Sequence, residues 1–151
     1  MTCIDVFTDR IEADFDHNIR VSGLGKRVVK RKGYSQDVLR TLEADAYEFI
    51  YIDGCHLASC AMTDMVMSWE LLKDGGIMII DDYNWSLAKP ATERPKLAVD
   101  AFIEAFSKQL EVRLIARQVV LRKRLQSAHE DRVGKPVVHD ESWHKKQKKD
   151  K

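Results

Sequence analysis

Aspartates stand directly after two apolar runs of the chain, where their carboxylates can bind a cation. Asp53 follows the run 47–52, and the pair Asp81 and Asp82 follows the run 77–80. Carboxylates that lie close together repel one another, so at least one of their pKa values must rise unless a cation intervenes. Oxygen-only ligands of this kind suit Mg²⁺, which keeps several waters and often binds a substrate oxygen as well. These aspartates are therefore the candidate metal ligands.

Other polar residues can bind or react near such a site. His56 lies three residues after Asp53 and can accept a proton from a metal-bound hydroxyl group. Asp5 ends an early apolar run, where a carboxylate can hold both ribose hydroxyls of a nucleoside-containing ligand. Ser35 and Gln36 offer a hydroxyl and an amide that suit the edge of an adenine base. Taken singly, each has a simpler interpretation, because aspartate favours turns, serine caps helices and loop histidines often bind backbone groups.

Apolar periodicity predicts strands and helices in alternation. The near-continuous apolar runs 47–52 and 77–80 are typical of strands that are buried on both faces of a parallel sheet. Spacings of three and four residues predict a helix over 58–72, ended by Gly75 and Gly76, and another helix behind Pro95. Further strands are expected over 2–7 and 27–31, further helices over 9–24 and 35–42 with Ser35 as the N-cap, and an antiparallel hairpin over 112–116 and 119–122.

This alternation of buried strands with helices indicates an α/β fold. We predict a Rossmann-like, doubly wound and mostly parallel sheet with an antiparallel C-terminal hairpin. Ligands of such sheets bind in the crevice outside the carboxyl ends of the strands. Because the candidate residues follow predicted strands, we expect them to converge on one rim of the sheet.

The composition describes one soluble globular domain. The chain has 151 residues, with 44% hydrophobic residues, 32% charged residues and a formal net charge of +1. No run approaches the ~20 apolar residues of a membrane span, and the acidic N-terminal segment does not resemble a secretory signal. Cys3, Cys55 and Cys60 lack a metal-knuckle spacing and suit free thiols in a reducing compartment. We therefore expect a cytoplasmic protein with no membrane partner.

A shift in charge and hydropathy divides the chain near residue 123. Residues 1–123 carry 17 basic and 19 acidic groups, whereas residues 124–151 carry 8 and 5 and contain few apolar residues. We predict a folded domain over 1–123 and a basic, disordered tail over 124–151. Such a tail can contact nucleic acid, but a solvated terminus is the favoured interpretation, and no nucleic-acid partner is expected.

Five segments, taken in their order along the chain, resemble the class I, Rossmann-like S-adenosylmethionine-dependent methyltransferases. The combination is most similar to methyltransferase family 24, with kinship to catechol O-methyltransferase and the metal-dependent sugar O-methyltransferases. Each motif alone is weak, but their order is specific and the resemblance covers residues 2–123. The segments are a strand end C-I-D at 3–5, a G-x-S-Q-D turn within 33–39, an apolar-I-D-G-x-H strand end at 47–56, an L-L-K-x-G-G turn at 71–76 and an apolar-D-D-Y strand end at 79–83.

The resemblance implies roles for the residues around the methyl donor. Asp5 matches the acid that holds the ribose of S-adenosylmethionine, and Ser35 with Gln36 matches the pair that meets adenine. The resemblance also assigns Asp53 to the binding site of the methyl donor. His56 falls where the catechol enzymes place a lysine general base, which implies a catalytic role for it.

The resemblance also implies a metal and an acceptor. Asp53 and Asp82 match metal-binding acids. Asp81 is a second candidate, because the family's acid can be aligned with either of the two adjacent aspartates. The implied reaction is metal-assisted O-methylation of a small hydroxylated acceptor, with S-adenosylmethionine as the donor and Mg²⁺ as the candidate metal.

The largest departure from the family lies at the start of the chain. In the family a first strand and its Gly-rich turn precede the segment that here begins at Met1, and Gly23-Leu24-Gly25 follows a predicted helix rather than a strand. We therefore expect an N-terminally truncated domain whose open sheet edges can pair with a second copy. A catalytically inactive remnant or fragment, acting only as a binding or oligomerisation module, is the alternative function. A phosphoacceptor receiver domain and an NAD-dependent dehydrogenase fit less well, because the aspartates come in the wrong order and the glycine fingerprint is missing.

Overall fold

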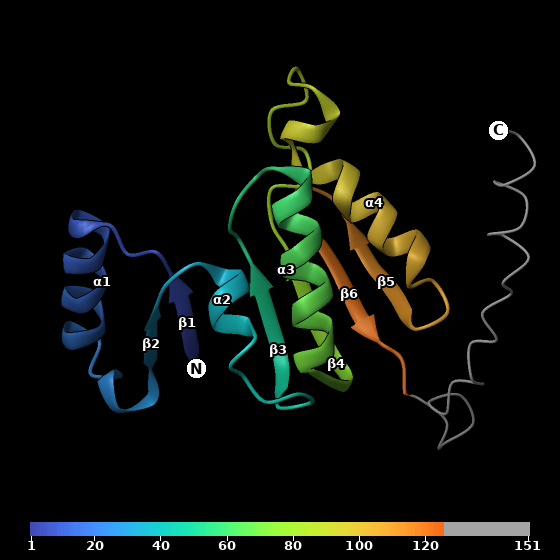
Figure 1. The fold of residues 1–151 in the computed structure, drawn as a ribbon. Coiled ribbons are helices and arrows are strands. Elements are labelled where there is room, and N and C mark those ends of the chain that lie inside the picture. Colours follow the sequence, from blue (N-terminus) through green and yellow to red (C-terminus); the bar gives the residue numbers. More distant parts are fainter. Residues whose placement is uncertain (126–151) are drawn as a thin grey trace, which may run out of the picture.

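The computed structural model describes residues 1–125, so the predicted basic tail lies outside the described residues except for its first two positions. The predicted alternation of strands and helices is confirmed, with ends that shift by a few residues (Figure 1). The strands are β1 (Thr2–Asp5), β2 (Val29–Lys32), β3 (Tyr47–Ile52), β4 (Leu72–Ile80), β5 (Leu110–Ile115) and β6 (Val119–Lys123), and the helices are α1 (Asp9–Val21), α2 (Ser35–Leu39), α3 (Ala58–Leu71) and α4 (Pro95–Ala105).

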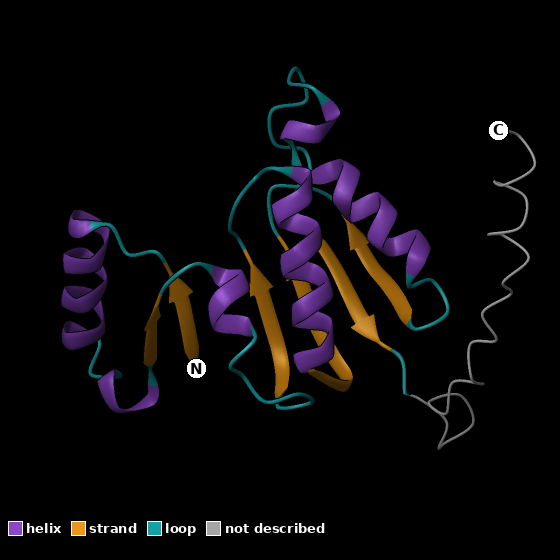
Figure 2. Ribbon diagram, in the orientation of Figure 1, coloured by secondary structure: helices purple, strands orange, loops and turns teal. Residues whose placement is uncertain are grey.

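The strands form two groups (Figure 2). β1 and β2 pair in parallel with each other, while β3, β4, β6 and β5 form a four-stranded sheet in that order. Within the larger sheet β3 and β4 are parallel, and β6 is antiparallel to both β4 and β5. The predicted α/β fold with parallel strands and an antiparallel C-terminal hairpin is therefore confirmed.

The hydrophobic core lies between the four-stranded sheet and the helices α3 and α4. Trp69 of α3 is 1% exposed, and its ring meets the Phe102 ring of α4 edge-on at 5.6 Å. Met78 of β4 and Leu121 of β6 close the core from the sheet side and are fully buried. Burial of large apolar side chains contributes roughly 1.5–3 kcal/mol each, so this cluster is the main source of stability and holds the ends of β3 and β4 in place.

Strand β3 differs from the sequence prediction in one respect. Its apolar run predicted burial on both faces, but Phe49 is 56% exposed and Tyr51 is 46% exposed, so that prediction is wrong. The reason is that α3 and α4 cover only the face that carries Ile50 and Ile52, which pack against the core. Among the described residues, no helix covers the other face of β3 to the same extent.

The β1–β2 pair lies beside β3, with β1 as its nearer strand (Figure 1). The two groups touch where Thr2 Oγ1 and Tyr47 Oη lie 3.4 Å apart, at the start of both strands. Because β1, β2 and β3 run in the same direction, their carboxyl ends lie at the same edge of the molecule, as expected.

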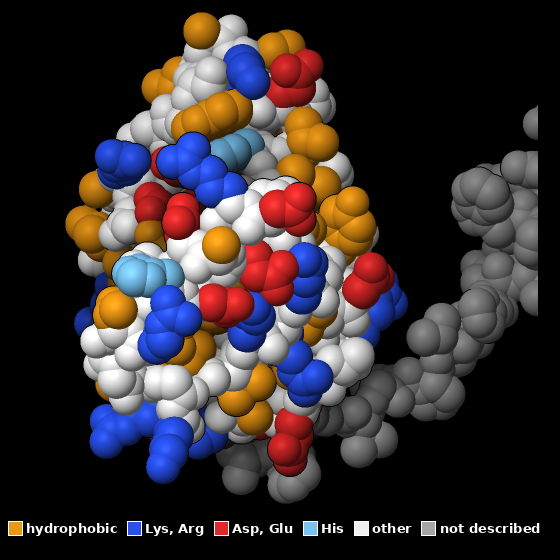
Figure 3. Space-filling model, turned by 90° about the vertical axis from the view of Figure 1, so that its left-hand side faces the viewer, with side chains coloured by type: hydrophobic (Ala, Val, Ile, Leu, Met, Phe, Trp, Pro, Cys, Tyr) orange, Lys and Arg blue, Asp and Glu red, His pale blue; other side chains and the backbone are white. Residues whose placement is uncertain are grey.

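Ion pairs hold α1 against β2. Lys30 Nζ lies 2.7 Å from Asp16 and 3.0 Å from Glu12, and Lys32 Nζ lies 2.5 Å from Glu12. Acidic and basic side chains are accordingly interspersed over this side of the molecule (Figure 3). Lys30 and Lys32 of β2 are thus engaged within the chain. Among the described residues, no helix has the length and apolar character needed to cross a membrane.

Candidate active site

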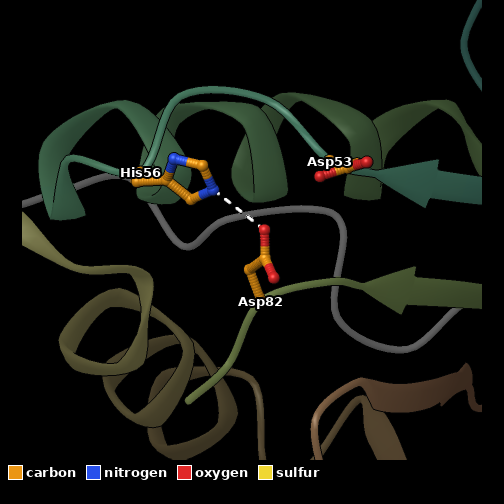
Figure 4. Close-up of side chains that lie close together, drawn as sticks. All are labelled: Asp53, His56 and Asp82. Atoms are coloured by element: carbon orange, nitrogen blue, oxygen red, sulfur yellow. Dashed lines mark hydrogen bonds and ion pairs between the residues drawn. The ribbon is translucent and has the colours of Figure 1, made fainter. Parts of the chain in front are cut away.

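Three of the predicted site residues form a cluster at the ends of β3 and β4 (Figure 4). Asp53 directly follows β3, His56 lies in the loop that leads to α3, and Asp82 lies just beyond β4. Each offers one ligand atom, and these atoms all lie within 4.8 Å of one another. His56 Nε2 is 2.9 Å from Asp82 Oδ2. Because an ionised carboxylate can only accept hydrogen bonds, Nε2 is the donor in this contact, and in the neutral imidazole the lone pair is then on Nδ1.

The chemistry of this cluster fits a divalent cation. The two carboxylates are ligands that Mg²⁺ or Mn²⁺ accepts, with water or substrate completing the shell. Partial desolvation, together with the negative charges of Asp81 and Asp82, raises the pKa of Asp53. A bound cation would reverse this effect, since positive charge favours the ionised carboxylate.

Asp81 does not belong to this cluster, because its oxygens are engaged with other donors. Its Oδ1 accepts the backbone N–H of Asp82 at 2.7 Å. Its Oδ2 accepts the Tyr51 hydroxyl and the Gln118 side-chain amide, the latter at 3.1 Å. The hydrogen bond from Tyr51 lowers the pKa of Asp81, and the same bond raises the pKa of Tyr51 to about 12. Within the double acid, the structure therefore directs Asp82 rather than Asp81 toward Asp53 and His56.

The backbone around Asp82 is clamped in an uncommon conformation. Asp82 has a φ of 56°, in the left-handed region that non-glycine residues seldom adopt. The next residue, Tyr83, is buried; its backbone N–H donates to Arg117 O at 2.9 Å and its hydroxyl donates to Asp100 at 2.7 Å. Arg117 also places its guanidinium 3.6 Å from Asp82 Oδ1. These contacts hold the strained residue from both sides.

An aromatic stack fixes the imidazole from the other side. The rings of His56 and Trp85 are nearly parallel, with 7° between their planes and 4.2 Å between their centroids. Lys89 Nζ lies 4.5 Å from the centroid of the Trp85 ring, within cation–π distance. Trp85, which lies three residues beyond Asp82, thus positions His56.

Two predicted donor-binding residues lie at the end of β1 and in the first turn of α2. Asp5 is exposed, and its Oδ1 accepts the backbone N–H of Phe7 at 2.7 Å, while its Oδ2 has no hydrogen-bond partner within residues 1–125. Gln36 is exposed in the first turn of α2. Their free polar atoms suit hydroxyl groups and a base edge at this rim, so the donor set fits a nucleoside-containing ligand.

Ser35 has a different partner from the predicted one. The expectation that it caps α2 is wrong, because Tyr34 is the N-cap residue and Ser35 makes no side-chain cap bond. Instead its hydroxyl donates to Asp64 Oδ1 of α3 at 2.7 Å. With the proton used in this way, Ser35 Oγ can only accept a hydrogen bond from a ligand, such as one from the amino group of adenine.

Asp64 was not predicted from the sequence, and it lies close to both Ser35 and Gly54. It is 6% exposed, and its Oδ2 approaches Gly54 so closely that a Cβ at that glycine would lie 3.2 Å away. The available signal was an acid within the apolar stripe of α3, between Ala61 and Met65. Tyr51, Gln118 and Arg117 were also missed, since nothing in their local sequence indicates their long-range contacts with the double acid.

The buried carboxyl of Asp64 predicts a pH dependence of stability. Burial raises its pKa, and the hydrogen bond from Ser35 opposes this shift. The folded chain keeps the proton to higher pH than the unfolded chain, so stability falls as the pH rises from the ordinary pKa of 3.8 through the folded value. Asp64→Asn keeps an acceptor for Ser35 and removes the charge. We expect its free energy of unfolding, measured by urea denaturation, to increase relative to that of wild type as the pH rises from about 4 to about 7.

The exposed Asp37→Asn variant is the control for this prediction, and its difference from wild type should not show that rise. A difference between Asp64→Asn and wild type that stays flat over the same range would contradict the role of burial at Asp64.

The sequence of the chain places it in a family. A family model described as "Methyltransferase domain", that of methyltransferase family 24, matches residues 1–83. This match spans more than half of the chain, and the chain belongs to this family of methyltransferase domains. The resemblance inferred from the motifs is therefore confirmed. No curated protein sequence matches the chain.

Solved structures share the fold. A protein from Corynebacterium glutamicum gives a TM-score of 0.67 at 21% identity, covering 85% of this chain and 62% of that one. The O-methyltransferase from Bacillus cereus in complex with SAH gives 0.65 at 14% identity, covering 82% of this chain and 62% of that one. An O-methyltransferase family protein from Burkholderia thailandensis gives 0.58 at 18% identity, covering 85% and 44%. The chain thus spans less than two thirds of each of these proteins.

Proposed function

We propose that the chain acts as an S-adenosylmethionine-dependent methyltransferase that methylates a hydroxyl group of a small acceptor with the help of a divalent metal. The observation that carries this proposal is the cluster of Asp53, His56 and Asp82, whose ligand atoms lie within 4.8 Å of one another in a methyltransferase domain. The names of the O-methyltransferases with the same fold support oxygen as the methyl acceptor.

Asp53 and Asp82 would hold the cation, with Mg²⁺ as the proposed ion. A divalent cation supplies charge that lowers the pKa of an acceptor hydroxyl and orients it. Asp81 contributes indirectly, because its oxygens already accept hydrogen bonds from Tyr51, Gln118 and the Asp82 backbone.

Asp5, Ser35 and Gln36 would hold the methyl donor, and Asp53 borders both ligands. S-adenosylmethionine supplies the methyl group as a sulfonium. The carboxylate of Asp5 would accept hydrogen bonds from ribose hydroxyls, while Ser35 and Gln36 would bind the edge of adenine. Much of the rate enhancement would come from holding the two substrates in line with each other.

His56 would take the proton of the acceptor hydroxyl. The Asp82 contact keeps the Nε2 proton in place, and the stack on Trp85 fixes the plane of the ring. Nδ1 is then the basic atom that accepts the proton. His56 can also serve as a third metal ligand. In that role an imidazole nitrogen of His56 would couple magnetically to a bound Mn²⁺ ion, whereas in the role of the base it would not.

A second candidate function rests on the exposed face of β3. Phe49 and Tyr51 are large and exposed, and β1 and β3 each have an edge without a hydrogen-bonded strand among the described residues. Such edges and faces favour association. The chain would then be a binding or oligomerisation module that pairs through these edges with a second copy.

All three cysteines are free thiols, which fits the cytoplasm as the proposed location of either function.

Replacement of His56 tests the proposed reaction. Transfer of a labelled methyl group from S-adenosylmethionine to catechol, used as the probe acceptor with MgCl₂, should occur in wild type and fall on the order of 10²–10⁴-fold in His56→Gln. His17→Gln is the matched control, because His17 lies on α1 and bonds only Arg20 in the described contacts.

Calorimetric titration with S-adenosylmethionine separates the two candidate functions. If wild type and His56→Gln both release heat on binding S-adenosylmethionine, and only the variant loses methyl transfer, the result supports His56 as the base. Full transfer in His56→Gln contradicts it. The absence of both heat and transfer in wild type favours the binding module.

A further inference from the structure

The carboxylate of Asp81 makes a hydrogen bond to the backbone of Asp82, next to the cation site. The carboxylate of Asp81 accepts the Asp82 N–H at 2.7 Å and so closes a tight turn around the residue with a φ of 56°. A non-glycine residue in the left-handed region costs on the order of 1–3 kcal/mol and persists only when its surroundings determine it. A carboxylate that fixes such a turn must itself be fixed.

Two donors from distant elements hold Asp81. Tyr51 reaches it from β3 and Gln118 from the turn between β5 and β6. Gln118 Nε2 also donates to the Tyr51 hydroxyl at 3.2 Å, so the three side chains form a closed triangle. The backbone N–H of Asp81 donates to Ile52 O at 2.9 Å and ties the same residue to β3. Both carboxylate oxygens and the backbone N–H of Asp81 are therefore engaged by groups other than Asp53 and His56.

We propose that Tyr51 and Gln118 are positioning residues, which hold Asp81 so that Asp81 in turn directs the Asp82 carboxylate toward the cation. This inference rests on the proposed metal-assisted function. It assigns a role to a tyrosine that packing does not explain, because its ring lies on the exposed face of β3 and is 46% exposed. Only its hydroxyl makes specific contacts, and both go to this network.

Tyr51→Phe removes the hydroxyl and leaves the exposed ring. Tyr47→Phe is the matched control, since Tyr47 also lies on β3 and its hydroxyl contacts Thr2 instead. Mn²⁺ affinity, measured by electron paramagnetic resonance on the full chain, should fall roughly 10-fold in Tyr51→Phe, as is typical when an outer partner of a metal ligand is lost. It should stay at the wild-type value in Tyr47→Phe. Gln118→Leu should weaken binding in the same direction.

A second measurement needs no metal. In the metal-free protein the Nε2 proton of His56 should give a protected NMR signal while Asp82 accepts its hydrogen bond. That signal should weaken in Tyr51→Phe and persist in Tyr47→Phe, while the thermal unfolding temperatures of the two variants stay alike. A purely structural role would instead lower the unfolding temperature and leave Mn²⁺ affinity and the His56 signal unchanged.

The outcomes separate this inference from the proposed function. Unchanged Mn²⁺ affinity and an unchanged His56 signal in Tyr51→Phe overturn the positioning role. If wild type itself binds no Mn²⁺, the metal part of the proposed function fails, and the His56 signal alone decides. Its loss in Tyr51→Phe but not in Tyr47→Phe supports the positioning role, and its persistence in both overturns that role.

Discussion

Replacement of Asp82 with asparagine is expected to abolish measurable binding of Mn²⁺ to this chain. Asp82 is one of the two carboxylates in the cluster, and its Oδ2 lies 2.9 Å from His56 Nε2. Asparagine keeps the shape of the side chain but removes the charge that a hard divalent cation needs. The loss should exceed the roughly 10–100-fold typical of residues outside the metal shell. Asp53→Asn should behave in the same way.

Electron paramagnetic resonance titration with Mn²⁺ measures this effect. Asp14→Asn is a suitable control, because Asp14 is an exposed residue of α1 whose partner, Arg10, lies 3.9 Å away. Its affinity for Mn²⁺ should equal that of wild type. Wild-type affinity in Asp82→Asn would remove this residue from the metal site and with it the proposed role of the β4 end.

Truncation of Phe102 is expected to cause the largest loss of stability. Phe102 is fully buried between the sheet and α3, with its ring 5.6 Å from Trp69 and 4.3 Å from Phe106. Phe102→Ala removes these contacts and leaves a cavity, which costs roughly 3–5 kcal/mol in a core. Since native domains have about 5–15 kcal/mol of unfolding free energy, this loss is a large fraction of the stability. Urea denaturation followed by circular dichroism measures it.

Phe49→Ala is the matched control for this loss. The same atoms are removed, but Phe49 is 56% exposed on β3, so the cost should be below about 1 kcal/mol. A cost at Phe49 as large as at Phe102 would mean that the exposed face of β3 is covered in solution. That result would contradict the exposure described here and favour the binding module.

The positions of Asp53 and Asp82 followed from the sequence because they depend on local pattern. Each ends an apolar run, and parallel strands that are neighbours in a sheet bring their carboxyl ends to one edge. The structure pairs β3 with β4 in parallel and places both carboxylates in one cluster with His56. Their roles in binding and catalysis stay predictions.

The choice between Asp81 and Asp82 did not follow from the sequence, because distant residues decide it. Tyr51 and Gln118 are 30 and 37 positions away from Asp81 and take up its carboxylate. Ser35 is a comparable case, since its hydroxyl bonds an acid 29 positions away instead of capping its own helix. Local propensity favours the cap, but the approach of α2 to α3 offers a buried carboxylate as the stronger acceptor.

The exposure of β3 also lay beyond the sequence pattern. An apolar run states that side chains can be buried, but it does not state which neighbours are present to bury them. Ile50 and Ile52 meet the core, whereas Phe49 and Tyr51 point to the other face. The hydroxyl group of Tyr51 can therefore take part in the hydrogen-bond network around Asp81.

Diffraction from crystals of the chain soaked with Mn²⁺ and S-adenosylhomocysteine, recorded at the manganese absorption edge, tests the central claim most directly. The account predicts one anomalous peak between Asp53 and Asp82, at about 2.0–2.3 Å from an oxygen of each, as is typical of hard divalent cations. A peak bound by other residues, or the absence of any peak in crystals where these carboxylates are free of lattice contacts, would contradict it.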